Sequence, residues 1–112
     1  MPPPRFQVIF EYEAQMEALD AAAYIAQNSP QNARQWYEGL ERAIDSLEIL
    51  PMRYGLAPES EYLGVELRHY LYKSYRIIYR VEEAAKTVRI LHVRHGHRRA
   101  IGEPVDPDDA SE

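Results

Sequence analysis

The sequence contains no cysteine, which excludes a disulfide framework, a zinc–thiolate site and a thiol nucleophile. It also lacks any run of about 18 apolar residues, the length that suggests a membrane-spanning helix, and its first residues do not resemble a signal peptide. We therefore expect a cytoplasmic protein that makes no membrane contact. At 112 residues, with 46% hydrophobic and 28% charged residues, the chain has the size and composition of one soluble globular domain.

Phenylalanine is scarce as well, since the sequence has two against nine tyrosines. Tyrosine keeps a polar hydroxyl group and so favours half-buried and interface positions. Four of the tyrosines lie close together, at Tyr70, Tyr72, Tyr75 and Tyr79. Sheet packing with an interface role is the preferred interpretation of this run, and stacking on the bases of single-stranded RNA is the alternative.

Positive charge is concentrated in one part of an acidic chain. The net charge of the whole sequence is −5, but residues 65–99 hold nine arginines and lysines against three glutamates, a balance of +6 that leaves −11 for the remainder. This distribution indicates that the basic stretch meets an anionic partner. Because nonspecific nucleic-acid binding depends on neutralising phosphates, the negative net charge confines any such contact to this stretch.

The hydrophobic pattern predicts a strand followed by a helix. Residues 6–12 alternate with period two and are rich in aromatic and β-branched side chains, as in a strand. Residues 13–28 change to a helical period. The buried stripe of this helix would consist of Met16, Leu19, Ala23 and Ala26, and its acidic residues Glu13, Glu17 and Asp20 would face solvent.

A second helix has the clearest boundaries in the sequence. Ser29 suits the N-cap, Pro30 suits the first helical position, and Pro51 ends the pattern. The apolar residues recur at helical spacing as far as residue 50, so Trp36 should be buried. The short break between the helices predicts an antiparallel hairpin, and Gly39 inside the second helix predicts the close approach of another backbone.

Three strands are predicted at residues 65–72, 75–82 and 87–95, after a loop at 52–64. The short links between them fit hairpins, so these strands should form a meander. The order is β-α-α-β-β-β, an α+β fold in which a two-helix hairpin packs on one face of a small, mostly antiparallel, four-stranded sheet and leaves the other face open. The expected organisation is a disordered N-terminus at 1–5, one domain at 6–99 and an acidic, mobile tail at 100–112.

This order and three motifs together resemble the RelE/ParE superfamily of toxins from type II toxin–antitoxin, or plasmid stabilisation, modules. The motifs are YIAQNSPQNARQWYEGLERAIDSLEILP across the two helices, LRHYLYKSYRIIYRV over two strands, and ILHVRHGHRR at the last strand. The resemblance covers residues 6–99. It implies a toxin neutralised by a cognate antitoxin, whose C-terminal segment folds onto the toxin by strand addition or helix docking.

The superfamily divides by target. ParE-like members inhibit DNA gyrase and are not nucleases, whereas RelE-like members are mRNA interferases that cut mRNA on the translating ribosome. The HVRHGHR ending is closer to the ParE-like branch, and no aromatic residue or histidine follows His97, where RelE-like enzymes usually place a tyrosine. A gyrase inhibitor that is not a classical enzyme is therefore the preferred interpretation. A RelE-like endoribonuclease and a nontoxic binding or regulatory relative are the alternatives, and the oligomeric state stays open.

Arginines and histidines of the basic stretch are the candidate site residues. By resemblance, Arg76 and Arg98 correspond to arginines that hold the scissile phosphate in RelE-like enzymes, where His95 or His97 would transfer protons. No metal or other cofactor is expected, because His92 points away from His95 on a strand and no acidic residue is near in sequence. The residues expected to contact the target or the antitoxin are Arg68, Lys73, Arg76, Arg80, Arg94, Arg98 and Arg99.

Overall fold

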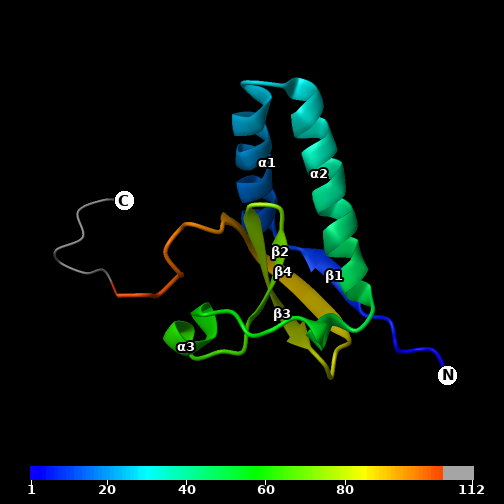
Figure 1. Ribbon diagram of the computed structural model, residues 1–112. Coiled ribbons are helices and arrows are strands. Elements are labelled where there is room, and N and C mark those ends of the chain that lie inside the picture. Colours follow the sequence, from blue (N-terminus) through cyan, green and yellow to red (C-terminus); the bar gives the residue numbers. More distant parts are fainter. Residues whose placement is uncertain (105–112) are drawn as a thin grey trace.

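The computed structural model describes residues 1–104, in which a helical hairpin lies against one sheet (Figure 1). The predicted order of a strand, two helices and three strands is confirmed, and with it the α+β fold. Most of the predicted acidic tail, residues 105–112, lies outside the described residues. The elements are β1 (Gln7–Phe10), α1 (Tyr12–Ala26), α2 (Pro30–Asp45), the 3-10 turns η1 (Ser46–Glu48) and η2 (Pro51–Arg53), α3 (Glu59–Leu63), β2 (Arg68–Tyr72), β3 (Tyr75–Glu82) and β4 (Thr87–His95).

The four strands form one mixed sheet in the order β1-β4-β3-β2. β2 pairs with β3 and β3 with β4 in antiparallel orientation, so the predicted meander is confirmed, whereas β1 runs parallel to β4. Lys73 has a φ of 52° in the two-residue turn between β2 and β3, the left-handed conformation that tight hairpins require. Ile78 pairs with His92 but Tyr79 pairs with Ile90, so β4 carries one extra residue in a β-bulge.

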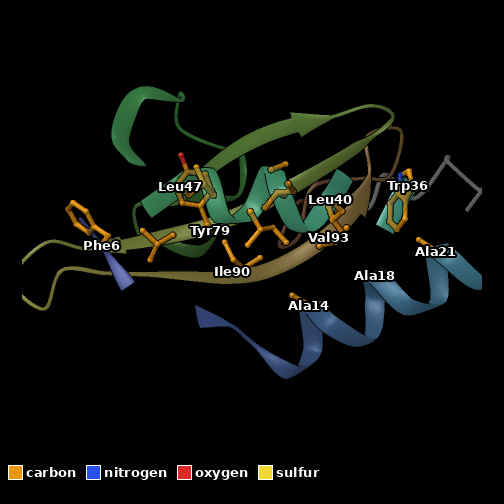
Figure 2. Close-up of a cluster of buried hydrophobic side chains, with 14 residues drawn as sticks. Phe6, Ala14, Ala18, Ala21, Trp36, Leu40, Leu47, Tyr79, Ile90 and Val93 are labelled. Atoms are coloured by element: carbon orange, nitrogen blue, oxygen red, sulfur yellow. The ribbon is translucent and has the colours of Figure 1, made fainter. Parts of the chain in front are cut away.

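The two long helices form the predicted antiparallel hairpin on one face of the sheet (Figure 1). The Ser29 hydroxyl oxygen accepts the N–H of Asn32 at 3.1 Å, and Pro30 opens α2, as expected. Trp36 and Leu40 are buried in the core between hairpin and sheet, which confirms the predicted inner face of α2 (Figure 2). No helix among residues 1–104 is both long and apolar enough to cross a membrane.

The chain turns sharply after α2. The helix ends at Asp45 and a 3-10 turn follows, so the prediction of a helix as far as Leu50 was wrong by one turn. Leu50 has a φ of 50°, and Arg53 donates hydrogen bonds to main-chain oxygens of this segment. The buried Tyr79 hydroxyl donates to the Pro51 carbonyl at 2.5 Å, and burial raises the pKa of Tyr79 to about 12. These side-chain hydrogen bonds hold the turn where the main-chain hydrogen bonds of α2 have ended.

The face that α1 turns toward the sheet differs from the prediction. Ala14, Ala18 and Ala21 are buried against the sheet (Figure 2). Met16 and Leu19, in contrast, are exposed. The three alanines lie at i, i+4 and i+7 and therefore share one helix face. Their single methyl groups let the α1 backbone approach β4 closely, which longer side chains would prevent. The buried stripe was therefore assigned to the wrong side of this helix.

Gly39 does mark a close approach, but by a side chain. A Cβ atom at this position would lie 2.1 Å from the hydroxyl oxygen of Tyr72. That hydroxyl donates a hydrogen bond to the main-chain oxygen of Trp36 at 2.9 Å. The expectation of a neighbouring backbone was therefore wrong, and β2 is instead joined to α2 by a tyrosine that crosses over the glycine.

The opposite face of the sheet is partly covered, although the sequence predicted an open face and a loop at 52–64. This stretch contains the short helix α3, and Ala57, Leu67 and Ile78 form a second buried cluster with Ile101 packed against it. The Ser60 hydroxyl bonds both the N–H and the carbonyl of Leu67 at 2.8 Å. Because this segment occupies the backbone before residue 68, β2 begins three residues later than predicted.

The proline-rich N-terminus, predicted as disordered, makes contacts at its last residues. The backbone of Arg5 bridges that of Ile49, and its guanidinium lies 2.5 Å from the carboxylate of Glu48. The N–H of Phe6 donates to the Glu48 carbonyl at 2.8 Å. These contacts tie the start of β1 to the turn after α2.

Candidate functional site

The C-terminal end of β4 lines a small cleft beside α1, which we call the β4 cleft. Its volume is about 250 Å³. It brings together Arg94, His95 and Arg98 of the predicted site residues. Tyr75, Val93, Ala21 and two acidic residues of α1, Glu17 and Asp20, complete the lining. Arg98 is exposed, so its guanidinium is available to an incoming anionic group.

His95 is held in place by two aromatic neighbours and a hydrogen bond. Its ring meets Tyr75 edge to face at 5.2 Å between centroids and stacks on His97 at 5.0 Å. The main-chain N–H of His97 donates to Nδ1 of His95 at 3.2 Å. With Nδ1 as acceptor, neutral His95 carries its proton on Nε2. These three contacts fix the orientation of the His95 ring in the cleft.

Glu17 and Asp20 place negative charge in the same cleft. The Glu17 carboxylate accepts the N–H of Val93 at 2.9 Å and lies 3.2 Å from Nδ1 of His92. It occupies the edge of β4 just beyond Phe10, the last residue at which β1 pairs with β4. The expectation that Glu17 belongs to a solvated face was therefore wrong, because its carboxylate extends the hydrogen bonding of the sheet.

Arg94 is only partly available to a ligand. One of its terminal nitrogens donates to the main-chain oxygen of Arg99 at 2.7 Å, and its Nε is buried without a hydrogen-bond partner among the described residues. Burial, followed by the nearby charge of Arg98, lowers the pKa of Arg94 below its ordinary value. Arg98 is therefore the more accessible cation of the β4 cleft.

Arg76 lies outside the β4 cleft, in a buried ion pair on the other face of the sheet. Its two terminal nitrogens lie 3.0 and 2.7 Å from the two carboxylate oxygens of Glu59. The side chain of Arg76 is 10% exposed and that of Glu59 is 0% exposed. The main-chain N–H of Ile101 donates to the same carboxylate at 3.2 Å. Glu59 was not predicted from the sequence. The only signal for it was Arg76 itself, an arginine between apolar residues of a strand, because a buried arginine needs a counter-charge.

The protonation states around this pair follow from its contacts. Burial alone would raise the pKa of Glu59, but hydrogen bonds from Arg76, its own N–H and Ile101, with the charge of Arg76, lower it to about 2. Burial and the charge of Arg76 lower the pKa of His69. Neutral His69 then accepts a hydrogen bond on Nδ1 from Arg76 at 3.1 Å. Glu59 and His69 thus both accept hydrogen bonds from the terminal nitrogens of Arg76 and leave them occupied.

The other predicted site residues are dispersed. Arg68 donates to the main-chain oxygen of Tyr54 at 2.7 Å and so holds the loop before α3. Lys73 lies in the β2–β3 turn, with its ammonium 5.9 Å from the Tyr72 ring centre. Arg80 is exposed on β3, and Arg99 lies 3.7 Å from the carboxylate of Glu103. Within residues 1–104, no three histidine, aspartate or glutamate side chains are grouped to hold a metal ion.

Comparisons with known proteins agree with this architecture. The sequence model of the family described as "ParE toxin of type II toxin-antitoxin system, parDE" matches residues 8–100. A chain of the toxin–antitoxin complex RelBE2 from Mycobacterium tuberculosis is similar with a TM-score of 0.55 and 23% identity, over 82% of this chain and 92% of that one. A chain of the chromosomal ParDE system from P. aeruginosa gives a TM-score of 0.65 and 16% identity, over 81% and 96%.

The two structural likenesses are below 25% identity and show the shared fold. No curated protein sequence matches the chain. The family match is the more specific finding, because it extends from β1 to just beyond β4 and includes the β4 cleft. The chain therefore belongs to the family of ParE toxins of type II toxin–antitoxin systems, within the RelE/ParE superfamily.

Proposed function

We propose that this toxin inhibits DNA gyrase through the β4 cleft and is neutralised by a cognate antitoxin. The choice of gyrase over mRNA as the target rests on one observation, the burial of Arg76 in an ion pair. A nuclease of the RelE-like kind would use this arginine to hold the scissile phosphate, since cations must stabilise the charge that develops there. Here both terminal nitrogens of Arg76 face the buried carboxylate of Glu59, beneath α3 and the segment around Ile101.

Releasing Arg76 for catalysis would require a large rearrangement. Removing one partner of a buried ion pair typically costs 3–5 kcal/mol, because the other charge is left uncompensated. The Glu59 carboxylate would also repel a phosphate brought to the same place. A binding function at the β4 cleft requires no such change, because Arg98 is already exposed.

The charges of the β4 cleft favour a protein surface as its ligand. Glu17 and Asp20 line one side and Arg94 and Arg98 another. An RNA backbone carries negative charge along its whole length and would be repelled by the acidic side. A protein surface with charges of both signs can pair with both sides, and such complementarity directs specificity and association rate.

The antitoxin part of the proposal is supported by the comparisons. The RelBE2 and ParDE structures that share this fold are toxin–antitoxin assemblies. We expect the antitoxin of this chain to be encoded next to it and to bring an acidic or mixed-charge segment to Arg98 and its neighbours. Such a segment would cover the β4 cleft and so prevent contact with gyrase.

The test is induced expression in a bacterium with pulse-labelling of DNA and protein synthesis during the first minutes. An early fall in DNA synthesis, with cleaved DNA trapped on gyrase, supports the proposal. An early fall in protein synthesis, with mRNA cut on ribosomes, contradicts it and identifies an mRNA interferase. In that case His95 and His97, which stack beside Arg98, are the first residues to substitute.

The variant that tests the site is Arg98→Glu, which reverses an exposed charge in the β4 cleft. We expect loss of toxicity with an unchanged melting temperature. Arg34→Glu is the matched control, because Arg34 is exposed on α2, outside the β4 cleft, and the charge change is the same. Full toxicity of Arg98→Glu contradicts the assignment. Arg76→Glu is a poor test, because it would bury two carboxylates side by side.

A further inference from the structure

The four clustered tyrosines of the sequence lie in three different places in the structure. Tyr79 is buried in the core, and Tyr75 lines the β4 cleft. Tyr70 and Tyr72, on β2, line a larger groove beside α2, which we call the tyrosine groove and whose volume is about 610 Å³. Its other lining residues are Gln35, Gly39, Arg42, Ala43, Ser46 and Lys73. The proposed function makes no use of this groove.

Both rings of the tyrosine groove are held in fixed positions. Tyr70 stacks on Tyr54, with 4.3 Å between the ring centres and 14° between the ring planes. The Tyr72 hydroxyl donates to the main-chain oxygen of Trp36 at 2.9 Å, and the side chain crosses over Gly39. Both tyrosines are half-buried, so part of each remains open to solvent. Because ordered side chains lose little conformational freedom when a ligand binds, the two rings form a preorganised aromatic surface.

Only positive charge lines the tyrosine groove. Arg42 of α2 and Lys73 of the β2–β3 turn are both exposed, and none of the described residues that line the groove is acidic. The Lys73 ammonium lies 5.9 Å from the centre of the Tyr72 ring. Burial raises the pKa of Tyr72, and the charge of Arg42 opposes this rise, so Arg42 also acts on this ring. Cations and aromatic rings are therefore neighbours in the groove.

Helix α2 carries its acidic residues on another side. Glu38, Glu41 and Asp45 all line a cleft beside β1, and Arg42 lies between the two hollows and lines both. The β4 cleft likewise contains charges of both signs. The tyrosine groove differs from both clefts because its cations have no acidic neighbour in the lining. Such a surface attracts a polyanion.

We propose that the tyrosine groove binds a segment of single-stranded nucleic acid, with bases against Tyr70 and Tyr72 and phosphates at Arg42 and Lys73. Every base has a flat face that can stack on a tyrosine, and an unpaired strand exposes these faces. Backbone phosphates pair with arginine and lysine. An acidic peptide would pair with the two cations but has no aromatic group to stack on the rings. The inference goes beyond the proposed function and does not depend on gyrase as the target.

DNA and RNA are the two sources of such a strand. Both present stacking bases joined by phosphates, so the rings and cations of the groove would accept either one. The experiment therefore measures fluorescence anisotropy of labelled oligothymidylate and of labelled oligouridylate with the purified protein. Each oligonucleotide has about eight nucleotides, within the range of single-strand sites on small domains. A duplex of the same length and an oligoglutamate peptide are measured beside them.

Arg42→Gln and Lys73→Gln test the phosphate contacts. Each should weaken binding and lower the slope of the logarithm of affinity against the logarithm of salt concentration by about 0.7, the value for one phosphate contact of a single strand. Arg34→Gln and Lys86→Gln are the matched controls and should leave the slope unchanged. Arg34 is exposed on the same helix, and Lys86 is exposed in another hairpin turn with a φ of 49°, and both lie outside the groove.

Tyr70→Leu tests the stacking. Leucine keeps an apolar contact with Tyr54 but removes the aromatic face, so the dissociation constant should rise about 5-fold or more. Tyr62→Leu is the control, since Tyr62 is 40% exposed and lies outside the groove. Melting curves by circular dichroism check that each variant is folded. If Tyr70→Leu does not fold, Arg42→Gln and Lys73→Gln decide by themselves.

The outcomes separate the possible ligands of the groove. Binding of either single strand that the groove variants weaken and the controls keep supports the inference, and the tighter strand identifies the source as DNA or RNA. Absence of binding to both strands at low salt overturns it, and so does an equal loss in the controls. A duplex that binds as tightly overturns it in favour of general attraction of phosphates. Oligoglutamate that binds as tightly, and equally well to Tyr70→Leu, overturns it in favour of an acidic protein segment.

Discussion

Arg76 holds Glu59 through two hydrogen bonds of 3.0 and 2.7 Å, although 17 residues separate them in the chain. Arg76 lies on β3, inside the sheet, and Glu59 opens the five-residue helix α3. A helix this short has no stability of its own in water. The ion pair and the cluster around Ile78 therefore fix α3 to the face of the sheet opposite the helical hairpin. The same pair occupies the arginine that the resemblance to RelE-like enzymes would assign to phosphate binding.

Glu59→Gln should destabilise the protein by about 3–5 kcal/mol, because it leaves the Arg76 guanidinium buried without its counter-charge. The measurement is the free energy of unfolding in urea. Glu61→Gln is the control, since Glu61 is exposed on the same short helix and makes no ion pair with residues 1–104, and it should change stability by less than about 0.5 kcal/mol. Equal stability of the two variants would show that the pair does not hold α3.

Acid should weaken the fold in a window set by Glu59. Its pKa is about 2 in the folded protein, below the value of about 4.3 for an unfolded chain. The folded state therefore binds this proton less readily, so the stabilisation is complete above about pH 4.3 and is lost as pH falls toward 2. The two pKa values correspond to about 3 kcal/mol, and the unfolding free energy of Glu59→Gln should be flatter across the window. Identical pH profiles for the variant and the original chain would contradict this assignment.

The sequence predicted the fold where the periodicity involves large residues. The buried side is identified by Trp36 and Leu40 on α2 and by the alternation in β3, because large apolar groups gain most by leaving water. In α1 the same reasoning failed. Met16 and Leu19 are more hydrophobic than alanine, so the pattern pointed them inward, but the space between α1 and the sheet admits only Ala14, Ala18 and Ala21. The distance between α1 and the sheet decided which side of the helix is buried, and a single sequence does not contain that distance.

The sequence predicted only part of the candidate site, because it does not show which distant segments come into contact. Arg94, His95 and Arg98 are close in sequence, and the structure places them in one cleft. The partners that define the surroundings of the predicted site residues come from distant segments. Glu17 of α1 lines this cleft, and Glu59, from a stretch predicted as a loop, pairs with Arg76 outside it. A single acidic residue on a predicted surface carries no local sign of burial. Contacts between segments so far apart depend on the fold as a whole.

Gly39→Ala should destabilise the protein even though alanine favours a helix by about 1 kcal/mol over glycine. The new methyl group would lie 2.1 Å from the Tyr72 hydroxyl oxygen, so the tyrosine must move and lose its bond to Trp36. Overpacking of this kind typically costs about 1–3 kcal/mol. Gly55→Ala is the control, because nothing lies within 4 Å of a Cβ at that position.

The cause of this loss can be tested with a double mutant. Tyr72→Phe removes the hydroxyl oxygen that the alanine meets first, so Gly39→Ala should cost less in the Tyr72→Phe background than in the original chain. The ring carbon that carried the hydroxyl would still lie 3.1 Å from the new methyl group, so the relief should be partial. Additive effects of the two substitutions would show that Gly39 serves another purpose.

Trp36→Ala should cost about 3–5 kcal/mol of stability, because it removes a buried aromatic ring from the core. The ring is 6% exposed and lies 5.1 Å from the Tyr75 ring, which itself packs against His95 in the β4 cleft. The cavity should therefore loosen Tyr75 and broaden the His95 ring signals in NMR spectra at temperatures where the variant is still folded. Tyr24→Ala is the control, since Tyr24 is 68% exposed and should change the melting temperature little. A Trp36→Ala melting curve that overlays the original would refute this burial, and unchanged His95 signals would show that the core and the β4 cleft are independent.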